Sequence, residues 1–554
     1  MKQNYIKSLL ASLVALLTPM SLMALEKDGL EYLISSAEDL MEFAQLVNAG
    51  EIEAEAQLMA DIDTRKLGKD FIPIGTQENP YCGRFYGNNH RITIDLVSTH
   101  DNYGLFSSLN KSGYISNLYV DGTIEAKHNN VGGIVGMISS IPSVQECTSN
   151  VNITVSKRDV HDIGGIIGWS YCLPGINIAH VENCIYTGHI MGHTDGSCAG
   201  IVGFCHTGYD AENRRRGTSI RNCLVTGVVD IEIPTLTNHI IAGGETPYTD
   251  IKNCYFINPC EIDGEFYDIG VERGGMTRVT MEQVESGEVC YRLNVDPFAA
   301  ILGAQRRTTI FRQNIGVDKY PVYDISHGIV TKIESFGYGT WAGGSFNGVG
   351  SAARTPKGVE AFAGTIDGDT LILHPVKVMD GSQGIAYIIK GEPGYYSLMP
   401  TSEKPTAVKN NLSGGIECVD TRYATYYVLG VENDVVGFYR LGSYIKALDS
   451  FTAFILDRDL DADVNMLPFV FEGPTIGDAN GDGKVTITDA VAVVNYILGT
   501  TQEKFDKLAA DVNEDGEITI TDAVGIVNII LNADSAGVKE RREREEVTTE
   551  REPD

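Results

Sequence analysis

Basic residues are scarce in this 554-residue sequence. The 43 Lys and Arg residues stand against 74 Asp and Glu residues, which leaves a formal net charge of -31. A chain of this charge repels phosphate backbones, so its composition excludes nucleic acid as an expected partner. The main basic cluster before the C-terminal tail, Arg214 to Arg216, is interpreted as a solvated loop.

Long hydrophobic runs are also missing. One apolar run, Leu9 to Leu17, follows Lys2 and Lys7 and is too short to span a bilayer. Its position is typical of a secretory signal peptide, residues 1-24, cleaved near Ala24. We therefore expect a secreted protein, extracellular or at the cell surface, with no transmembrane segment in the mature chain. No Cys lies near Ala24, which argues against a lipid anchor.

Close pairs of thiol or imidazole groups are lacking as well, which argues against a zinc site. The 11 cysteines are an odd number for a secreted protein. Four of them end the similar tetrapeptides VQEC, VENC, IRNC and IKNC, at Cys147, Cys184, Cys223 and Cys254. Repetition of one motif indicates one structural position, a small buried side chain stacked above its equivalent. We favour buried free thiols at these positions, and disulfides are the alternative.

Glycine-rich blocks recur in the same region. GGIVG at 132 to 136, GGIIG at 164 to 168 and AGIVG at 199 to 203 are each followed by a polar loop and one of the Cys tetrapeptides. Each apolar pair suits a short inward-facing strand, and the glycines permit tight corners and close approach of neighbouring coils. Constant strands with variable loops predict a solenoid whose coils share one core.

These repeats carry a resemblance to a known family. Residues 30 to 330, including PIGTQENPYCGRFYGNNHRITI (73 to 94) and SGEVCYRLN (286 to 294), resemble bacterial surface proteins with GLUG-type repeats. The resemblance implies a right-handed parallel β-solenoid and an adhesin-like role.

A capped amphipathic helix is expected at Ser36 to Asn48. Beyond Gly328, alternating strands such as Thr370 to Val378, and a hairpin that turns at Glu432 to Asp434, predict a β-sandwich-like domain.

The clearest chemical signal is a duplicated twelve-residue motif. DANGDGKVTITD, residues 478 to 489, returns 33 positions later as DVNEDGEITITD, residues 511 to 522. Calcium takes six to eight oxygen ligands, and such a loop supplies them from alternate positions. We expect two calcium ions. The predicted ligands are Asp478, Asn480, Asp482, Lys484 (through its carbonyl), Thr486 and Asp489, then Asp511, Asn513, Asp515, Glu517, Thr519 and Asp522.

Each loop leads directly into an apolar helix and ends in Asp, where an ordinary EF-hand has Glu. This pattern, present twice, resembles the type I dockerin family. The resemblance implies a cohesin-like protein domain as partner, contacted by loop positions 10 and 11 and the helix that follows. These positions are Ile487 and Thr488 in the first copy and Ile520 and Thr521 in the second. Either copy could face the partner after a half-turn, and a clasp against the preceding β-domain is the alternative.

The expected organisation is mainly β: a right-handed parallel β-solenoid, then a β-sandwich-like domain, then a small α-helical calcium-binding dockerin with paired EF-hand-like loops. The predicted boundaries are 1-24 (signal peptide), 25-64 (N-terminal cap with a short helix), 65-265 (β-solenoid), 266-330 (C-terminal cap of the solenoid), 331-473 (β-sandwich-like domain), 474-536 (dockerin type I) and 537-554 (charged tail).

The repeats show no pair of facing carboxylates of the kind that a glycoside hydrolase needs. Asp95, Asp121, Asp162 and Asp195 occur singly, and His161, His189 and His193 are interpreted as polar surface. Trp169, Tyr171 and Tyr209 could form a sugar-stacking platform, although packing is the favoured interpretation.

We therefore expect a non-catalytic, adhesin-like or carbohydrate-associated protein. It would be tethered through its dockerin in a polysaccharide-degrading or cell-surface setting, with a polysaccharide or cell-surface ligand. The alternative is a polysaccharide hydrolase or lyase on the β-solenoid.

Overall fold

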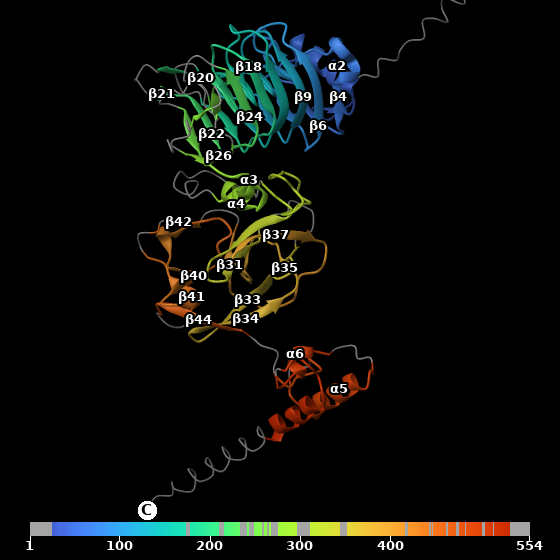
Figure 1. Cartoon of the computed structure of the whole chain (residues 1–554), viewed down its shortest axis with the longest axis vertical. Coiled ribbons are helices and arrows are strands. Elements are labelled where there is room, and N and C mark those ends of the chain that lie inside the picture. The colour runs from blue at the N-terminus through green and yellow to red at the C-terminus, as the bar shows by residue number, and fades with distance from the viewer. Residues whose placement is uncertain are drawn as a thin grey trace, which may run out of the picture.

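The structure is a computed structural model. It describes residues 25–172, 178–209, 215–232, 241–242, 249–257, 260–262, 265–267, 275–295, 311–343, 352–415, 419–442, 445, 447–460, 464–471, 476–481, 484–500, 505–513 and 515–531. The predicted signal peptide and charged tail lie outside these residues. Figure 1 shows a block of stacked strands, a second β region and a C-terminal group of helices following one another along the longest axis. None of the described helices is long and apolar enough to cross a bilayer.

Strands of the first block pair mostly in parallel and form four sheets. The first sheet holds, in pairing order, β1 (Lys27–Asp28), β2 (Glu31–Ile34), β3 (Glu55–Leu58), β5 (Arg84–Tyr86), β8 (Tyr114–Ser116), β12 (Ser143–Gln145), β16 (Ala179–Glu182), β22 (Thr218–Arg221) and β25 (Asp250–Lys252). The second holds β4 (Ile62–Asp63), β6 (Arg91–Val97), β9 (Tyr119–Ala126), β13 (Thr148–Val155), β17 (Ile185–Tyr186), β23 (Leu224–Val225), β26 (Cys254–Phe256) and β29 (Met276–Arg278), with β18 (His189–His193) and β24 (Val228–Glu232) beside it.

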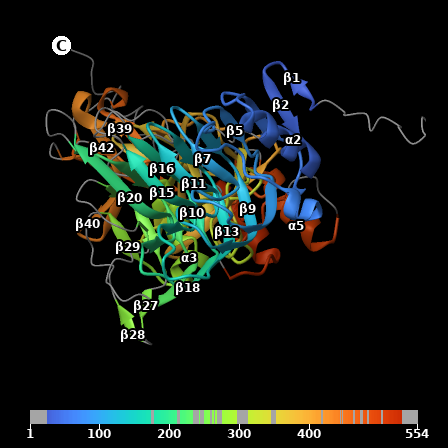
Figure 2. The same ribbon diagram turned by 90° about the horizontal axis from the view of Figure 1, so that it is seen from above.

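Two further sheets contain the glycine-rich blocks. One holds β7 (Phe106–Leu109), β11 (Val135–Ser139), β15 (Ile167–Cys172), β20 (Val202–Tyr209) and β21 (Arg215–Arg216); the other holds β10 (Val131–Gly132), β14 (Ile163–Gly164) and β19 (Cys198–Ala199). Figure 2 shows β7, β11, β15 and β20 side by side, as their pairing requires. Strands β27 (Cys260–Ile262) and β28 (Glu265–Tyr267) form a separate antiparallel hairpin, and β27 lies close to β24.

Successive repeats lie directly beside one another. Strand β13 pairs with β9 over eight consecutive residues, and its far half pairs with β18. The glycines make this approach possible: a Cβ on Gly133 would lie 2.3 Å from the carbonyl oxygen of Gly165, and one on Gly165 would lie 2.2 Å from that of Gly200. The mainly β class and the parallel stacking of the repeats therefore agree with the sequence prediction.

The four Cys tetrapeptides occupy one repeated corner. Cys147, Cys184, Cys223 and Cys254 are fully buried free thiols, as we favoured from the sequence. Burial raises the pKa of the Cys147 and Cys223 thiols, so they stay protonated.

The residues before these cysteines all adopt positive φ; three are Asn, which tolerates this conformation better than most residues, and the fourth is Glu146. The side-chain nitrogen of Asn222 donates to Asn183 Oδ1 at 2.9 Å, and that of Asn253 donates to Asn222 Oδ1 at 2.9 Å. The amide side chains of Asn183, Asn222 and Asn253 therefore form a hydrogen-bonded ladder beside the buried thiols.

Helix α2 (Ala37–Asn48) confirms the predicted N-terminal helix. The hydroxyl oxygen of Ser36 accepts the Asp39 N–H, and Leu40, Phe43 and Val47 are fully buried against the first strands. A 3-10 segment, η1 (Thr64–Asp70), follows. Helices α3 (Met281–Glu285) and α4 (Glu288–Asn294) cover the other end of the stack.

The second β region is mixed and largely antiparallel. One sheet contains β30 (Ile329–Ile333), β37 (Gly394–Thr401), β32 (Ala352–Arg354) and β35 (Met379–Asp380). The larger sheet contains β31 (Tyr338–Ala342), β36 (Gly384–Lys390), β33 (Glu360–Asp367), β34 (Thr370–Val376), β44 (Met466–Phe471), β41 (Val435–Arg440), β40 (Tyr426–Glu432), β43 (Phe454–Leu456) and β38 (Ser413–Gly414). A short pair, β39 (Val419–Asp420) with β42 (Ala447–Leu448), and two 3-10 turns, η2 (Thr421–Tyr423) and η3 (Asp457–Asp459), complete it.

The predicted hairpin is present with a shorter turn than expected. Glu432 pairs with Val435 and belongs to β40, so Asn433 and Asp434 alone make the turn. Both turn residues have positive φ, which is the conformation that a two-residue hairpin turn requires. The sequence prediction had placed Glu432 in the turn.

Hydrogen bonds made by residues between Gln313 and Tyr323 connect the two β regions. The Tyr323 hydroxyl donates to the carbonyl oxygen of Asn183 at 2.5 Å. The Ser397 hydroxyl of β37 donates to the carbonyl oxygen of Gln313 at 2.6 Å and accepts the Ile315 N–H at 3.0 Å. These contacts reach across segments far apart in the sequence and hold the regions together.

Candidate functional site

The C-terminal segment, residues 476–531, contains two helices that repeat one another. Helix α5 (Ile487–Ile497) follows the first predicted loop, and residues 520–531 form the equivalent helix after the second. A short helix, α6 (Lys507–Ala510), lies between them and is capped by Asp506. Val493 and Ile526, which are 33 positions apart, are both fully buried in a small core made mostly of alanine.

The closing aspartates of the two loops are fully buried. The Asp489 carboxylate accepts the N–H groups of Asn480 and Thr486, both at 2.9 Å, and the hydroxyl of Thr486 at 3.2 Å. Asp522 accepts the Thr519 N–H at 2.8 Å, the Thr519 hydroxyl at 3.3 Å and the Val512 N–H at 3.0 Å. Each carboxylate thus ties the start of its loop to the start of the following helix.

Other polar residues of the second loop are joined to one another by hydrogen bonds. Asp511 accepts the N–H groups of Asp515 and Gly516, at 3.2 and 2.8 Å. Asn513 Oδ1 accepts the Asp515 N–H at 3.1 Å, and Asp515 accepts the Glu517 N–H at 2.8 Å. Gly516 makes the sharp turn with φ of 83°, as the motif predicts.

The first loop is described in part. Asp478 is buried, the Asn480 side-chain nitrogen donates to the Thr488 hydroxyl at 3.1 Å, and Lys484 is exposed. The Thr486 and Thr488 hydroxyls lie 2.6 Å apart, as the Thr519 and Thr521 hydroxyls lie 2.5 Å apart. Asp482 and Gly483 lie outside the described residues. Corresponding contacts in both loops show that the duplication extends to side-chain geometry.

These residues suit a hard cation. Every hydrogen bond that Asp489 and Asp522 accept within the described residues comes from a neutral donor. A buried carboxylate without a positive partner is costly, so a cation in each loop would stabilise the fold. The donors offered are carboxylate, amide, hydroxyl and backbone oxygens, the set that calcium prefers. Among the described residues, no group of three or more His, Cys, Asp and Glu side chains is placed to hold a metal ion, and amide, hydroxyl and backbone oxygens would have to complete each loop's ligand set.

The predicted partner-binding residues lie on the surface. Ile487 and Ile520 are each 62% exposed, and Thr488 and Thr521 are exposed beside them. The apolar exposure continues along both helices through Val491 and Leu498 in the first, and through the equivalent Val524 and Leu531 in the second. The segment therefore presents two matching apolar stripes.

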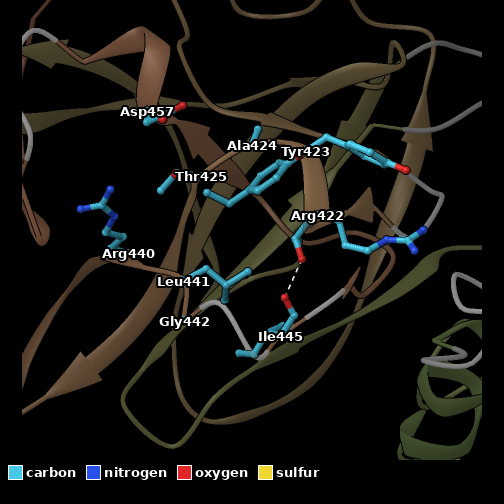
Figure 3. Close-up of a pocket in the computed structure, with 11 residues that line it drawn as sticks. Arg422, Tyr423, Ala424, Thr425, Arg440, Leu441, Gly442, Ile445 and Asp457 are labelled. Atoms are coloured by element: carbon cyan, nitrogen blue, oxygen red, sulfur yellow. Dashed lines mark hydrogen bonds between the residues drawn. The ribbon is translucent and has the colours of Figure 1, made fainter.

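A cavity of about 670 Å³ lies at the edge of the second β region (Figure 3). Figure 3 shows Arg440 and Arg422 on opposite sides of it. The Arg422 guanidinium binds the Asp420 carboxylate, and this holds the pKa of Asp420 at about 2. Arg422 is thus already engaged by a neighbouring acid.

The acids and histidines of the repeats fall into two groups. Asp95 accepts the Thr123 hydroxyl at 2.5 Å and Asp121 lies 3.2 Å from Arg91, so both belong to surface pairs. His189 lies 3.9 Å from Asp230 on the neighbouring strand.

Asp162, Asp195 and His161, by contrast, line one cavity of about 440 Å³ together with Asp101 and Trp169. The sequence prediction treated these acids as isolated, and the stacking of the repeats brings them together. Burial raises the pKa of Asp162 to about 6. The side chain of Tyr209 lies outside the described residues.

Comparison with known proteins supports the C-terminal assignment. The family model of the dockerin type I domain matches residues 476–531. No curated protein matches the chain. Among solved structures, the chain is similar to one titled as that of "a putative immunoglobulin A1 protease" from Bacteroides ovatus, with 17% sequence identity and a TM-score of 0.40, covering 54% of this chain and 93% of that one. The likeness at that TM-score carries no argument about activity. Residues 476–531 are a dockerin type I domain, a calcium-binding module whose partners are cohesins.

Proposed function

We propose that this chain is a secreted, non-catalytic binding protein, tethered to a cohesin-bearing partner by its calcium-loaded dockerin. In this proposal residues 65-265 form a right-handed parallel β-solenoid that presents the ligand-binding surface. Residues 25-64 and 266-330 cap it, residues 331-473 form a β-sandwich-like spacer, and residues 474-536 form the dockerin. The signal peptide, residues 1-24, directs the chain out of the cell.

Two calcium ions, one in each loop, complete the dockerin. The proposed ligands are Asp478, Asn480, Asp482, Thr486 and Asp489 with the Lys484 carbonyl, and Asp511, Asn513, Asp515, Thr519 and Asp522 with the Glu517 carbonyl. Residues 476 to 536 carry eleven Asp or Glu against three Lys, so two divalent ions would halve the net charge of -8. The fully buried core is small and five of its seven residues are alanine, so we expect ion binding to contribute to folding.

The observation that carries the tethering proposal is the duplicated apolar stripe. Exposed large apolar side chains in a row mark interaction surfaces. Here Ile487, Val491 and Leu498 are repeated at an offset of 33 residues by Ile520, Val524 and Leu531. Since the positions implied for cohesin contact begin each stripe, either helix can face the partner.

Calorimetry of the full-length protein against cohesin domains from the same source tests this proposal. We expect one cohesin to bind per chain at about 2 mM calcium and none to bind after chelation with EDTA, because the loops fold around the ions. Binding that persists equally in EDTA, or no binding to any cohesin in calcium, would contradict tethering. The latter result together with normal calcium binding would favour the intramolecular clasp.

A polysaccharide hydrolase or lyase is the second candidate. The observation that favours it is the cavity lined by Asp101, Asp162 and Asp195, because glycoside hydrolysis uses paired carboxylates. Release of new reducing ends from a soluble polysaccharide would identify that activity.

A further inference from the structure

One sheet of the stacked repeats keeps aromatic side chains at its surface. Trp169 on β15 and Phe204 on β20 are paired in register, and Met137 occupies the same row on β11. All three are half-buried, whereas Ile167, two residues before Trp169, is fully buried. The row that contains Ile167 therefore faces inward, and the row of Met137, Trp169 and Phe204 faces outward.

The second tryptophan of the chain provides the contrast. Trp341 is fully buried and packs beside Tyr387, as a core tryptophan does. Trp169 instead adjoins Tyr171, with ring centroids 5.1 Å apart, and Tyr171 stacks on the exposed His206 at 5.0 Å. These rings form a partly solvated platform across two neighbouring strands.

A row of polar side chains runs beside this platform. Asp101, Asn129, His161 and Asp195 follow one another at intervals of 28, 32 and 34 residues, one in each successive repeat. Asp101 Oδ1 accepts the Asn129 N–H at 2.9 Å, and Asn129 Oδ1 accepts the His161 N–H at 2.9 Å. Because the Asp101 and Asn129 side chains are each bonded to the next repeat, this part of the row is held in place before any ligand arrives.

Close packing of the repeats also positions the end of the row. A Cβ on Gly196 would lie 2.4 Å from His161 Nδ1, so only glycine lets Asp195 and His161 approach in this way. Three strand spacings of about 4.8 Å separate Asp101 from Asp195, which makes the row about 14 Å long. The cavity of about 440 Å³ lies between this row and the side chains of Trp169 and Phe204.

We propose that this groove binds a neutral polysaccharide, with sugar rings stacked on Trp169 and Phe204 and sugar hydroxyls bound by the Asp101, Asp162 and Asp195 carboxylates. A pyranose ring offers an apolar C–H face and a rim of hydroxyl donors, which matches an aromatic platform beside carboxylate acceptors. Asp162 strengthens the match, because its half-buried side chain lines the groove and accepts no hydrogen bond within the described residues. This inference deepens the proposed function by naming the ligand class of the tethered surface.

The negative charge of the groove favours neutral polysaccharides over anionic ones. The lining residues include three aspartates and no Lys or Arg, and the chain carries a net charge of -31. Uronate-containing polysaccharides would place carboxylates against carboxylates, which costs free energy. A groove that spans several repeats and is open along its length suits a linear neutral chain.

Affinity electrophoresis of the full-length protein tests the proposal. Native gels would contain arabinoxylan, mixed-linkage β-glucan or galactomannan as neutral probes and polygalacturonate as the anionic control. We expect retardation by at least one neutral polysaccharide, no retardation by polygalacturonate, and a tenfold or greater loss of affinity in Trp169→Ala. Asp195→Asn, which keeps the side-chain size, should also weaken binding. Tyr423→Ala removes an exposed tyrosine outside the groove and should bind as the unsubstituted protein does.

Tryptophan fluorescence gives an independent reading. The chain has two tryptophans and Trp341 is buried, so a change in emission on adding polysaccharide would report on Trp169. All measurements are repeated in EDTA, where groove binding should persist while cohesin binding is lost. Polysaccharide binding that is absent, that favours polygalacturonate, or that is unchanged in a folded Trp169→Ala protein would overturn the proposal and leave the dockerin function standing. Reducing ends released by the unsubstituted protein but not by Asp162→Asn would support the groove and overturn its non-catalytic role.

Discussion

Asp489 and Asp522 hold the same place in two loops that lie 33 residues apart. Each carboxylate is fully buried and accepts the N–H of a threonine three residues before it, at 2.9 Å from Thr486 and 2.8 Å from Thr519. Each therefore closes its loop and caps the helix that begins there. In the proposed calcium-loaded dockerin, ion binding and helix formation would therefore be coupled through one side chain in each copy.

Asp489→Asn and Asp522→Asn test this coupling. Either substitution removes a charged ligand and turns an NH2 group toward backbone donors, so that loop should lose its ion. Because ligand binding stabilises the folded state, the rise in unfolding temperature on adding calcium should fall to about half in each single variant and vanish in the double variant. Differential scanning calorimetry of the dockerin transition measures this.

The matched control is Asp506→Asn. Asp506 caps α6 outside both loops, and an Asn there can still accept the Leu508 N–H. Its response to calcium should equal that of the unsubstituted protein. If the loop variants responded like this control, the two aspartates would not be calcium ligands.

The two apolar stripes predict redundancy in cohesin binding. Ile487→Asp or Ile520→Asp alone should weaken binding by about twofold, since the other helix remains available. The double substitution should weaken it by at least a hundredfold, because a charge then faces the partner in both orientations. Leu508→Asp alters an even more exposed leucine, on α6, and serves as the control. A hundredfold loss in one single variant would show that only one helix is used.

Asn222 tests the ladder beside the buried thiols. Asn222→Ala removes the bonds to Asn183 and Asn253 and also forces alanine to a φ of 50°. Asn222→Gly removes the same bonds without the backbone strain. We expect a loss of about 3 kcal/mol for Ala and about 2 kcal/mol for Gly in the free energy of unfolding by denaturant. Equal losses would place the whole effect in the side-chain bonds.

Asp162 predicts a dependence of stability on pH. Burial raises the pKa of Asp162 from 3.8 to about 6, so the folded protein holds this proton more tightly than the unfolded chain. The contribution of Asp162 to the free energy of unfolding is therefore fully present below about pH 4, and it is lost as the pH rises through about 6. At about 1.4 kcal/mol for each pKa unit, the cost at neutral pH is roughly 3 kcal/mol.

Asp162→Asn should remove that cost, because Asn130 already occupies the preceding corner at a similar φ of 60°. The variant should be more stable than the unsubstituted protein at pH 7 and no more stable at pH 4, as measured by urea unfolding. A stability difference that does not change with pH would contradict the buried-carboxylate account.

Short-range features could be predicted from the sequence. The dockerin loops, helix α2 and the hairpin of β40 and β41 each depend on residues within a dozen positions, where ligand spacing, caps and turn residues act directly. The exposed positions of Ile487 and Ile520 follow equally from loop position.

Features that depend on how the stacked repeats align with one another could not be predicted from the sequence. Asp101 and Asp195 are separated by loops of unequal length, so nothing in their spacing shows that they line one groove with Trp169. For the same reason, the bond from Tyr323 to Asn183 across 140 positions leaves no local signal. The sequence interpretation of the acids as isolated followed from this missing register.

Calcium titration of the full-length protein by isothermal calorimetry is the most direct measurement of the central claim. The account predicts two ions bound per chain, with a gain of helix detected by circular dichroism over the same calcium range. Binding of no calcium would contradict the assignment of residues 476–531 as a calcium-loaded dockerin.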